Sequence, residues 1–254
     1  MNCETRKPLL EVCAGDLESV EAAAAGGAGR VELCSALADG GVTPSIGFLR
    51  RALMVPGLKV HVLIRPRGGD FLYTPAEVDA MTDDIVAARE AGAHGVVIGA
   101  LTADGDIDME ACRRMAEAAA GMNITFHRAF DLCRDPFEAL EQIISLGCNR
   151  ILTSGQAPSA LEGTELLRSL NERAAGRLTI LAGGGVSPEN AAEILRRSGT
   201  HEIHASARHT ISSPMRYRKP GIAMGAPGTD EYARKVTSPQ IVAEIVKAIN
   251  TTEQ

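Results

Sequence analysis

Residues 9–35 read LLEVCAGDLESVEAAAAGGAGRVELCS, and one short pattern occurs twice in this stretch. Leu10-Glu-Val-Cys13 and Val31-Glu-Leu-Cys34 are both typical of strands, and an alanine-rich run that ends in two glycines separates them. Asp16 can cap that run as a helix, so the stretch predicts two parallel strands joined by a right-handed helical crossover. A parallel strand that is covered on both faces is normally apolar throughout. The carboxylate and the thiol of each strand depart from this rule and indicate a functional site.

A glycine junction repeats along the chain and sets the predicted architecture. Gly27, Gly92, Gly147 and Gly199 each end a helix-like run shortly before a strand-like run, and each interval holds one further strand and helix. The expected strands are Leu9–Cys13, Val31–Ser35, Lys59–Arg65, Gly95–Ala100, Asn123–Arg128, Arg150–Ser154, Leu178–Gly183 and Glu202–Arg208. The expected helices include Pro75–Ala91, Asp108–Ala120, Pro136–Leu146, Ser159–Ala174 and Pro188–Arg197. Parallel strands that alternate with helices in this way predict an α/β fold, a (β/α)8 TIM barrel, with residues 1–254 in a single domain.

The main alternative is an open doubly wound sheet. Such a sheet usually has fewer strands, and the Gly-x-Gly-x-x-Gly that would support it is absent after the first strand. Residues 209–237 are polar and contain Pro and Gly, so we expect a long loop that covers the C-terminal face of the barrel as a lid. Residues 238–250 are expected to form the final helix.

The composition limits the classes of function. The chain has 254 residues, 45 % of them hydrophobic, and a net charge of -6. These values suit one globular core and argue against nonspecific binding of nucleic acid or of a membrane. We find no apolar run long enough to cross a bilayer and no signal-peptide pattern, so a cytoplasmic location is expected. The six cysteines lack disulfide-framework or CxxC spacing, which fits a reducing compartment.

Catalytic residues of a barrel lie at the C-terminal ends of the strands and on the loops that follow. In this sequence these positions carry acids, bases and thiols, whereas the strand starts are mostly apolar or small. The candidates for catalysis are Glu11, Glu32, Arg65, His127, Arg128, Asp131 and His204. The candidates for binding a small anionic or phosphorylated molecule are Arg67, Asp70, Ser154, Gly183, Gly184, Gly185, Ser206 and Arg208. This uneven distribution predicts a site at the mouth of the barrel.

Each of these residues also has a structural interpretation. Glu11 and Glu32 could form an ion-pair network with Arg65, because buried carboxylates need partners. Gly183–Gly185 is either a tight turn or, given its place after the seventh strand, a phosphate cradle. A Schiff-base aldolase is disfavoured because no lysine ends a strand, and a binuclear metal hydrolase because no His-x-His follows the first strand.

The two cysteines of the repeated pattern have two interpretations as well. A buried cysteine usually acts as a small apolar residue. Cys13 and Cys34, however, lie on neighbouring strands, which are about 4.8 Å apart, and two thiolates at that spacing could bridge one soft ion such as Cu(I). A four-ligand zinc site is harder to build, since His127 would have to reach across the barrel.

Further segments form a specific set together with the two Glu-x-Cys motifs. They are Glu11-Val-Cys13, Glu32-Leu-Cys-Ser35, Gly40-Gly-Val-Thr-Pro-Ser45, Ile64-Arg-Pro-Arg-Gly-Gly-Asp-Phe71, Gly99-Ala-Leu-Thr102, Thr125-Phe-His-Arg-Ala-Phe-Asp131, Leu152-Thr-Ser-Gly155, Gly183-Gly-Gly185 and His204-Ala-Ser-Ala-Arg208. Taken together, the motifs resemble those of the copper homeostasis protein family CutC over most of the chain.

The resemblance implies a cytoplasmic TIM barrel that takes part in copper handling and forms a homodimer or higher homo-oligomer. It also implies that Cys13 and Cys34 bind copper as Cu(I). It implies no established reaction. Two hypotheses therefore stay open: a Cu(I)-binding protein, and an enzyme that acts on a small anionic molecule. The second accounts for more of the polar strand ends.

Overall fold

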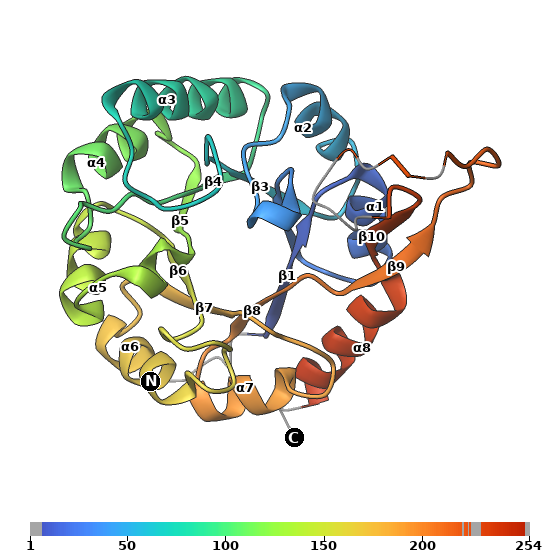
Figure 1. The fold of residues 1–254 in the computed structure, drawn as a ribbon. Coiled ribbons are helices and arrows are strands. Elements are labelled where there is room, and N and C mark those ends of the chain that lie inside the picture. The colour runs from blue at the N-terminus through green and yellow to red at the C-terminus, as the bar shows by residue number, and fades with distance from the viewer. Residues whose placement is uncertain (1–6, 220, 223, 225–229, 252–254) are drawn as a thin grey trace.

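Eight parallel strands close into a barrel in the computed structural model, which describes residues 7–219, 221, 222, 224 and 230–251 (Figure 1). The strands are β1 (Leu9–Ala14), β2 (Arg30–Leu33), β3 (Lys59–Leu63), β4 (Gly95–Ile98), β5 (Asn123–Phe126), β6 (Arg150–Thr153), β7 (Thr179–Gly183) and β8 (Glu202–Ala205). Each strand pairs with the next, and β8 pairs with β1. The predicted TIM barrel is confirmed, and the open sheet is excluded.

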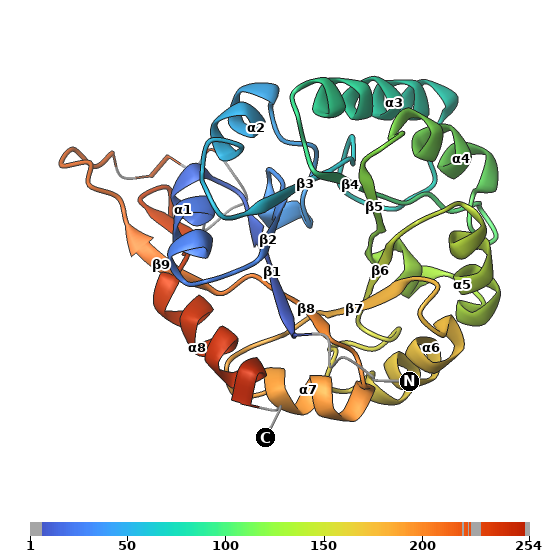
Figure 2. The same cartoon turned by 180° about the vertical axis from the view of Figure 1, so that it is seen from behind.

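An outer ring of helices covers the strands, as Figure 2 shows from behind. The helices are α1 (Leu17–Ala25), α2 (Ile46–Ala52), α3 (Pro75–Glu90), α4 (Met109–Ala118), α5 (Pro136–Ser145), α6 (Thr164–Ala174), α7 (Ala191–Ser198) and α8 (Pro239–Asn250), with short 3-10 turns η1 (Leu37–Asp39) and η2 (Arg128–Leu132). Local sequence explains several helix starts: the Asp16 side chain accepts a hydrogen bond from the Ser19 N–H at 2.8 Å, and Thr74 and Glu77 form a capping box. None of the helices described here combines the length and the apolar composition needed to cross a membrane.

Two helices begin clearly later than the sequence predicts. α7 starts at Ala191 instead of Pro188, and α6 starts at Thr164 instead of Ser159. The loop before α6 packs across the end of β7, where the Ala160 N–H donates to the Gly184 carbonyl at 2.9 Å. This tertiary contact keeps the first residues of the predicted helix in a loop at the barrel mouth.

The main apolar core lies between the strands and the helices. Strand residues such as Val12, Val31 and Ile98 are fully buried there, together with helix residues such as Met81 and Ile143. Because side chains alternate along a strand, the other half of the strand residues points into the barrel. The packing of helices against strands therefore forms the main stabilising core, and the side chains inside the barrel are available to form a functional site.

The barrel interior is charged at the strand starts, where the sequence analysis expected apolar or small residues. Arg30 begins β2 and Glu202 begins β8, and they are 3 % and 6 % exposed. The Arg30 guanidinium pairs with both Glu11 and Glu202, and Arg150 at the start of β6 pairs with Glu202 at 2.7 Å. The expectation was wrong because ion pairs between strands far apart in the sequence satisfy these charges.

Residues 209–237, which the sequence predicts to be a loop over the mouth, contain two strands. β9 (Arg208–Ser212) and β10 (Ala233–Thr237) form an antiparallel pair, and Figure 1 shows this hairpin extending outward beyond α1 and α8. β10 is tied to α1, since the Thr237 N–H donates to the Ser19 hydroxyl at 3.0 Å. The prediction of a loop is therefore wrong at both ends of this segment, which form paired strands. Residues 220, 223 and 225–229 of the predicted lid lie outside the described residues.

Candidate functional site

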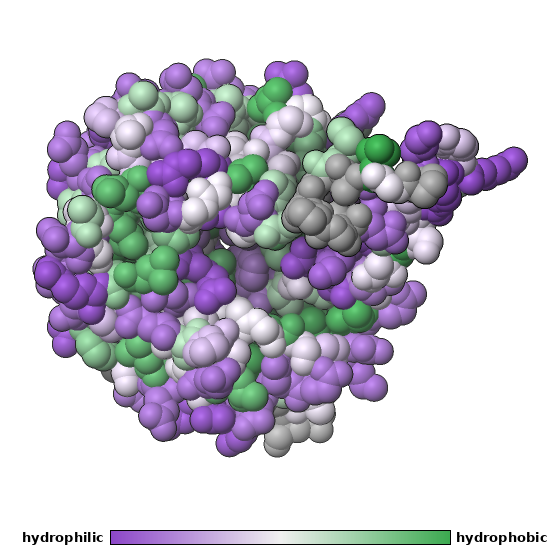
Figure 3. Space-filling model, in the orientation of Figure 1, coloured by the Kyte–Doolittle hydropathy of each residue, from purple (hydrophilic) through white to green (hydrophobic). Residues whose placement is uncertain are grey.

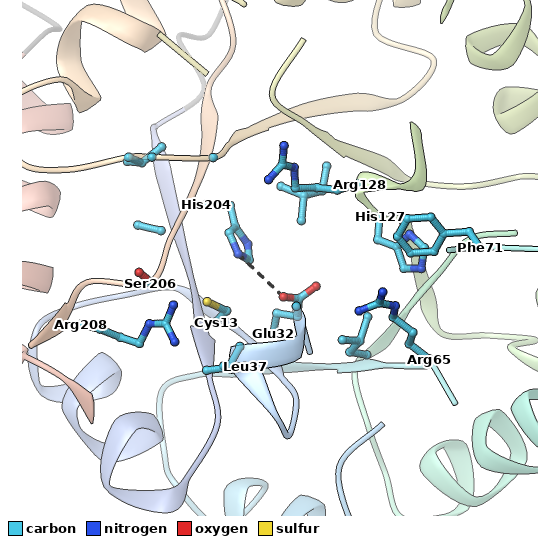
Figure 4. A pocket seen from close by; sticks show the side chains of 17 residues that line it. Cys13, Glu32, Leu37, Arg65, Phe71, His127, Arg128, His204, Ser206 and Arg208 are labelled. Atoms are coloured by element: carbon cyan, nitrogen blue, oxygen red, sulfur yellow. Dashed lines mark ion pairs between the residues drawn. The ribbon is translucent and has the colours of Figure 1, made fainter. Parts of the chain in front are cut away.

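The strand ends surround a cavity of about 310 Å³ at the mouth of the barrel. The face shown in Figure 3 is hollowed near its centre, over the ring of strands, and Figure 4 shows the side chains around the cavity. The lining residues are Cys13, Glu32, Leu37, Gly40, Leu63, Arg65, Phe71, His127, Arg128, Leu152, Gly184, Gly185, Val186, His204, Ala205, Ser206 and Arg208. A cavity of this size suits a small-molecule ligand.

His204 joins two carboxylates in the wall of this cavity. Its Nδ1 lies 2.8 Å from Oε1 of Glu11, and its Nε2 lies 3.8 Å from Oε2 of Glu32. Burial lowers the pKa of His204, but hydrogen bonds to Cys13 and Glu11 and the charge of Glu32 outweigh burial and raise the pKa well above its ordinary value. His204 is therefore an imidazolium near neutral pH, and its Nε2 can donate a proton.

Glu32 is the carboxylate that reaches the cavity. Burial raises its pKa, the charge of His204 opposes this shift, and the charge of Glu11 adds to it, so that the pKa is about 7. A group with this pKa is present in both protonation states at neutral pH, which is the property that a general acid or base needs.

Glu11 lies beneath the cavity and is 0 % exposed. Burial raises its pKa, but Arg30 and His204 outweigh burial and hold the pKa of Glu11 well below its ordinary range. The cation that pairs with Glu11 is thus Arg30, and not Arg65 as the sequence suggested. The Arg65 guanidinium instead donates to three loop carbonyls at 3.1, 2.9 and 2.7 Å. Glu11 is a permanently ionised residue that orients His204.

His127 lines the cavity as an uncharged side chain. Burial and the charge of Arg65 lower the pKa of His127 to about 3. Its Nδ1 accepts a hydrogen bond from the Ala129 N–H at 3.2 Å, and its ring centroid lies 4.9 Å from that of Phe71. His127 therefore does not act as an imidazolium near neutral pH.

The turns after β7 and β8 form the part of the cavity that suits an anion. Gly184 and Gly185 have φ angles of +112° and +70°, a region in which other residues are strained. Within the described residues, the N–H groups of Gly185 and Val186 and the Ser206 hydroxyl have no hydrogen-bond partner. Figure 4 shows Ser206 and Arg208 on the same side of the cavity. Amides, a hydroxyl and a guanidinium are the groups that bind phosphate or carboxylate.

Some of the candidate residues lie outside the cavity lining. They are Glu11, Cys34, Arg67, Asp70, Asp131, Ser154 and Gly183. Arg67 forms ion pairs with Asp70 at 3.0 Å and with a glutamate of α3 at 2.6 Å. Asp131 accepts hydrogen bonds from the Ser154 N–H at 3.1 Å and from Arg128 at 2.7 Å. These contacts hold the loops that shape the mouth.

Cys13 and Cys34 lie in one small apolar cluster with Leu63 and Val97, and Cys13 alone of the two thiols lines the cavity. The Cys34 thiol donates to the Ala14 carbonyl at 3.6 Å, and burial raises its pKa well above the ordinary value. No group of three or more His, Cys, Asp or Glu side chains that could hold a metal ion is found in the described part of the chain. Thiol sulfur is the soft kind of donor that Cu(I) prefers, so these two cysteines are the residues that could hold such an ion.

Three residues beneath and beside the cavity were not predicted from the sequence. Arg30 and Glu202 carry the ion network, and the ring of Phe71 packs in a tilted arrangement against His127. A signal for the first two was present, because Arg30 precedes Glu32 by two residues and Glu202 precedes His204 by two. Residues two apart on a strand share one face, so this spacing places them inside the barrel.

The comparisons with known proteins agree on one family. The model of the CutC family matches residues 8–209. A CutC family protein of Chromobacterium violaceum is 52 % identical over 242 residues, which cover 95 % of this chain and 98 % of that protein. A relative from Bacteroides thetaiotaomicron is 51 % identical over 250 residues, with 97 % and 100 % coverage. A crystal structure of CutC from Streptococcus agalactiae, provisionally described as a copper homeostasis protein, has 36 % identity and a TM-score of 0.75 and covers 78 % of this chain and 98 % of its own. The chain belongs to the CutC family.

Proposed function

We propose that the mouth of the barrel is the active site of an enzyme that binds a small anionic molecule, such as a phosphate ester, and transfers a proton on it. The observation that carries this proposal is Glu32, a cavity-lining carboxylate with a pKa of about 7. A buried carboxylate that serves stability is normally paired so that its charge is stabilised, as Glu11 is. A carboxylate kept near neutral pKa in a cavity is typical of a catalytic group.

The neighbouring residues suit complementary roles in such a transfer. Ionised Glu32 would accept a proton from the ligand, while the His204 Nε2–H would donate to an oxygen on which negative charge develops. Glu11 supports this role because its carboxylate binds Nδ1 at 2.8 Å and keeps the ring protonated. The anionic group of the ligand would bind the amides of Gly185 and Val186 together with the side chains after β8.

The proposal is tested without knowing the substrate. A crystal soaked in inorganic phosphate should show the anion between Gly185 and Ser206, and carbon-13 NMR should show that the Glu32 carboxyl titrates near pH 7. Glu77 is the internal reference, because a hydrogen bond from the Thr74 backbone lowers its pKa. An empty mouth, or a Glu32 carboxyl that titrates near pH 4, would refute the proposal.

Binding of Cu(I) is a second candidate, favoured by the two thiols in one apolar cluster beside the cavity. Copper would then be the bound cargo. A competition titration with Cu(I) should compare the wild type with the Cys13→Ser/Cys34→Ser variant. The matched control is Cys112→Ser/Cys148→Ser, which removes two buried thiols elsewhere in the barrel. Equal affinities in all three proteins would end this idea.

The homo-oligomeric state and the cytoplasmic location that the family resemblance implies are proposals as well. Light scattering of the purified protein should give a mass of at least two chains. Cell fractionation should recover the protein in the cytoplasmic fraction. A monomer, or recovery in another fraction, would overturn the corresponding proposal.

A further inference from the structure

His127 is a polar side chain of the cavity that the proposed proton transfer does not use. It lies on the side opposite His204, together with Arg65 and Phe71, and Glu32 lies between the two sides (Figure 4). His127 is 4 % exposed and lines the cavity. Its ring nitrogens therefore face either the protein or a bound ligand.

The hydrogen bonds of His127 determine which nitrogen carries the proton. The Ala129 N–H donates to Nδ1 at 3.2 Å, so Nδ1 holds the lone pair and the proton lies on Nε2. A second proton does not bind near neutral pH, because burial and the charge of Arg65 lower the pKa to about 3. The Nε2–H is thus a neutral hydrogen-bond donor at every pH at which the protein is expected to work.

This donor lacks an acceptor. Within the described part of the chain, Nε2 of His127 is buried and has no hydrogen-bond partner. Buried N–H groups without an acceptor are uncommon, because their desolvation is not compensated. His127 lines the cavity, so a ligand oxygen there can supply the missing acceptor when the side chains that cover Nε2 move aside.

The ring of His127 is held in place by its neighbours. Its centroid lies 4.9 Å from the ring of Phe71 and 6.0 Å from the ring of Phe126. On another side lies Gly99, where a Cβ atom would be 2.6 Å from the imidazole. Glycine at this position therefore makes room for the ring, and aromatic packing keeps the donor oriented before a ligand binds.

We propose that the Nε2–H of His127 recognises an uncharged oxygen of the ligand, a carbonyl or a hydroxyl, so that the mouth selects molecules that carry both this oxygen and an anionic group. The inference rests on the proposed function, because it takes the anion site after β7 and β8 as given. His127 is a binding residue in this scheme, and Glu32 and His204 carry the proton transfer.

An uncharged acceptor suits this side of the cavity better than an anion. The Arg65 guanidinium donates to the carbonyls of Asp39, Gly41 and Gly69 and lies 4.9 Å above the ring of Phe71. Its two terminal nitrogens are therefore engaged by the protein, whereas its Nε is buried without a hydrogen-bond partner in the described residues and is a second donor for an oxygen on this side. Arg208 and Ser206 lie on the other side of the cavity (Figure 4), and an anionic group is expected there.

Two phosphate esters that differ in one oxygen test the inference. Hydroxyacetone phosphate carries a carbonyl, and propyl phosphate has the same chain without it. Calorimetry on the wild type should give about 10-fold tighter binding of hydroxyacetone phosphate, the gain expected when a buried donor finds its acceptor. The Nε2–H resonance of His127 should also move when hydroxyacetone phosphate is added, and should stay in place with propyl phosphate.

Variants separate this role from a structural one. His127→Phe should bind both esters with the affinity that the wild type has for propyl phosphate, and His127→Gln, which keeps an N–H donor, should restore part of the preference. His94→Phe, on the opposite face of the barrel, should leave the preference unchanged.

Equal affinity of the wild type for both esters, or an equal loss for both in His127→Phe, would overturn the inference while the anion site stands. If neither ester binds, nor inorganic phosphate, the proposed function fails and this inference fails with it.

Discussion

Replacing Arg30 with methionine should destabilise the protein by an amount that depends on pH. Arg30 is 3 % exposed and is the shared cation of Glu11 and Glu202 inside the barrel. Methionine is apolar and removes the charge. Glu11 then keeps only His204 as an ionic partner, and Glu202 keeps only Arg150. The variant tests whether the fold depends on this buried ion network.

The expected loss of stability follows from the cost of protonating the carboxylate, because a buried carboxylate without a partner can take up a proton and lose its charge. At pH 7 this costs about 3.7 kcal/mol, or about 1.36 kcal/mol for each pH unit above the unfolded pKa of about 4.3. At pH 5 the same step costs only about 1 kcal/mol. Removing one member of a buried ion pair typically costs about 3–5 kcal/mol. We therefore expect a loss of about 3–4 kcal/mol at pH 7 that shrinks to about 1 kcal/mol at pH 5.

The direction of the pH dependence follows from the pKa of Glu11. In the wild type this pKa is lowered, so its contribution is complete above the unfolded pKa and is lost only as the pH falls through the folded value. In Arg30→Met the pKa of Glu11 is raised instead, so stability is lost as the pH rises. The difference between the two proteins must therefore grow from pH 5 to pH 7.

Urea denaturation followed by circular dichroism at pH 5, 6 and 7 measures this difference. Arg114→Met is the matched control, because Arg114 pairs with Asp79 at 2.6 Å while the two side chains are 43 % and 64 % exposed. Exposed pairs contribute little, so the control should unfold like the wild type. The double variant Arg30→Met/Glu11→Gln should recover part of the loss at pH 7. Equal losses in Arg30→Met and Arg114→Met, or a loss that does not change with pH, would refute the reasoning.

Three further predictions concern side chains in and below the cavity. Glu32→Gln should stabilise the protein by up to about 3 kcal/mol at pH 8 and little at pH 5, because a carboxyl with a raised pKa destabilises the folded protein as the pH rises from the unfolded pKa to about 7. Urea midpoints at both pH values measure this difference, and a destabilised variant at pH 8 would contradict the prediction. Burial above all lowers the pKa values of His61 and His127 to about 3. The free energy of unfolding should therefore be unaffected by these groups above pH 6.5 and fall below that pH by up to about 1.4 kcal/mol per pH unit for each group. Denaturation at a series of pH values should show a smaller decrease per pH unit in His61→Leu, and an unchanged decrease would count against the lowered pKa of His61. Gly99→Ala should cost roughly 1–3 kcal/mol by overpacking, because its Cβ would lie 2.6 Å from His127, and a thermal midpoint equal to that of the wild type would show that the ring can move.

Several residues of the cavity could be predicted from the sequence because strand ends meet at one face of a barrel. Glu32, His204 and His127 end three different strands, and all three line the cavity. The alternation of side chains also places Cys13 on the inner face of β1. Their chemistry was harder to predict. His127 was a candidate acid or base, and in the structure burial and Arg65 keep it uncharged near neutral pH.

The pairing of the charges could not be predicted by local reasoning. From the sequence, Arg65 was the candidate partner of Glu11, because both lie near the ends of strands. The observed partner, Arg30, is 19 residues away, and Glu202 is a further 172 residues from Arg30. The barrel closes β8 against β1, and only this closure brings the first and last strands to the same cation.

The sequence by itself determined the barrel, because the order of strands and helices, the glycine junctions and the helix caps are all local signals that recur along the chain. Tertiary structure alone decided which carboxylate is ionised and which titrates near neutral pH. Glu11 and Glu32 begin from the same side-chain chemistry, and their pKa values separate because Arg30 lies against one of them and the other faces the cavity. A pKa depends on burial and on charges in space, and neither is a property of the neighbouring sequence.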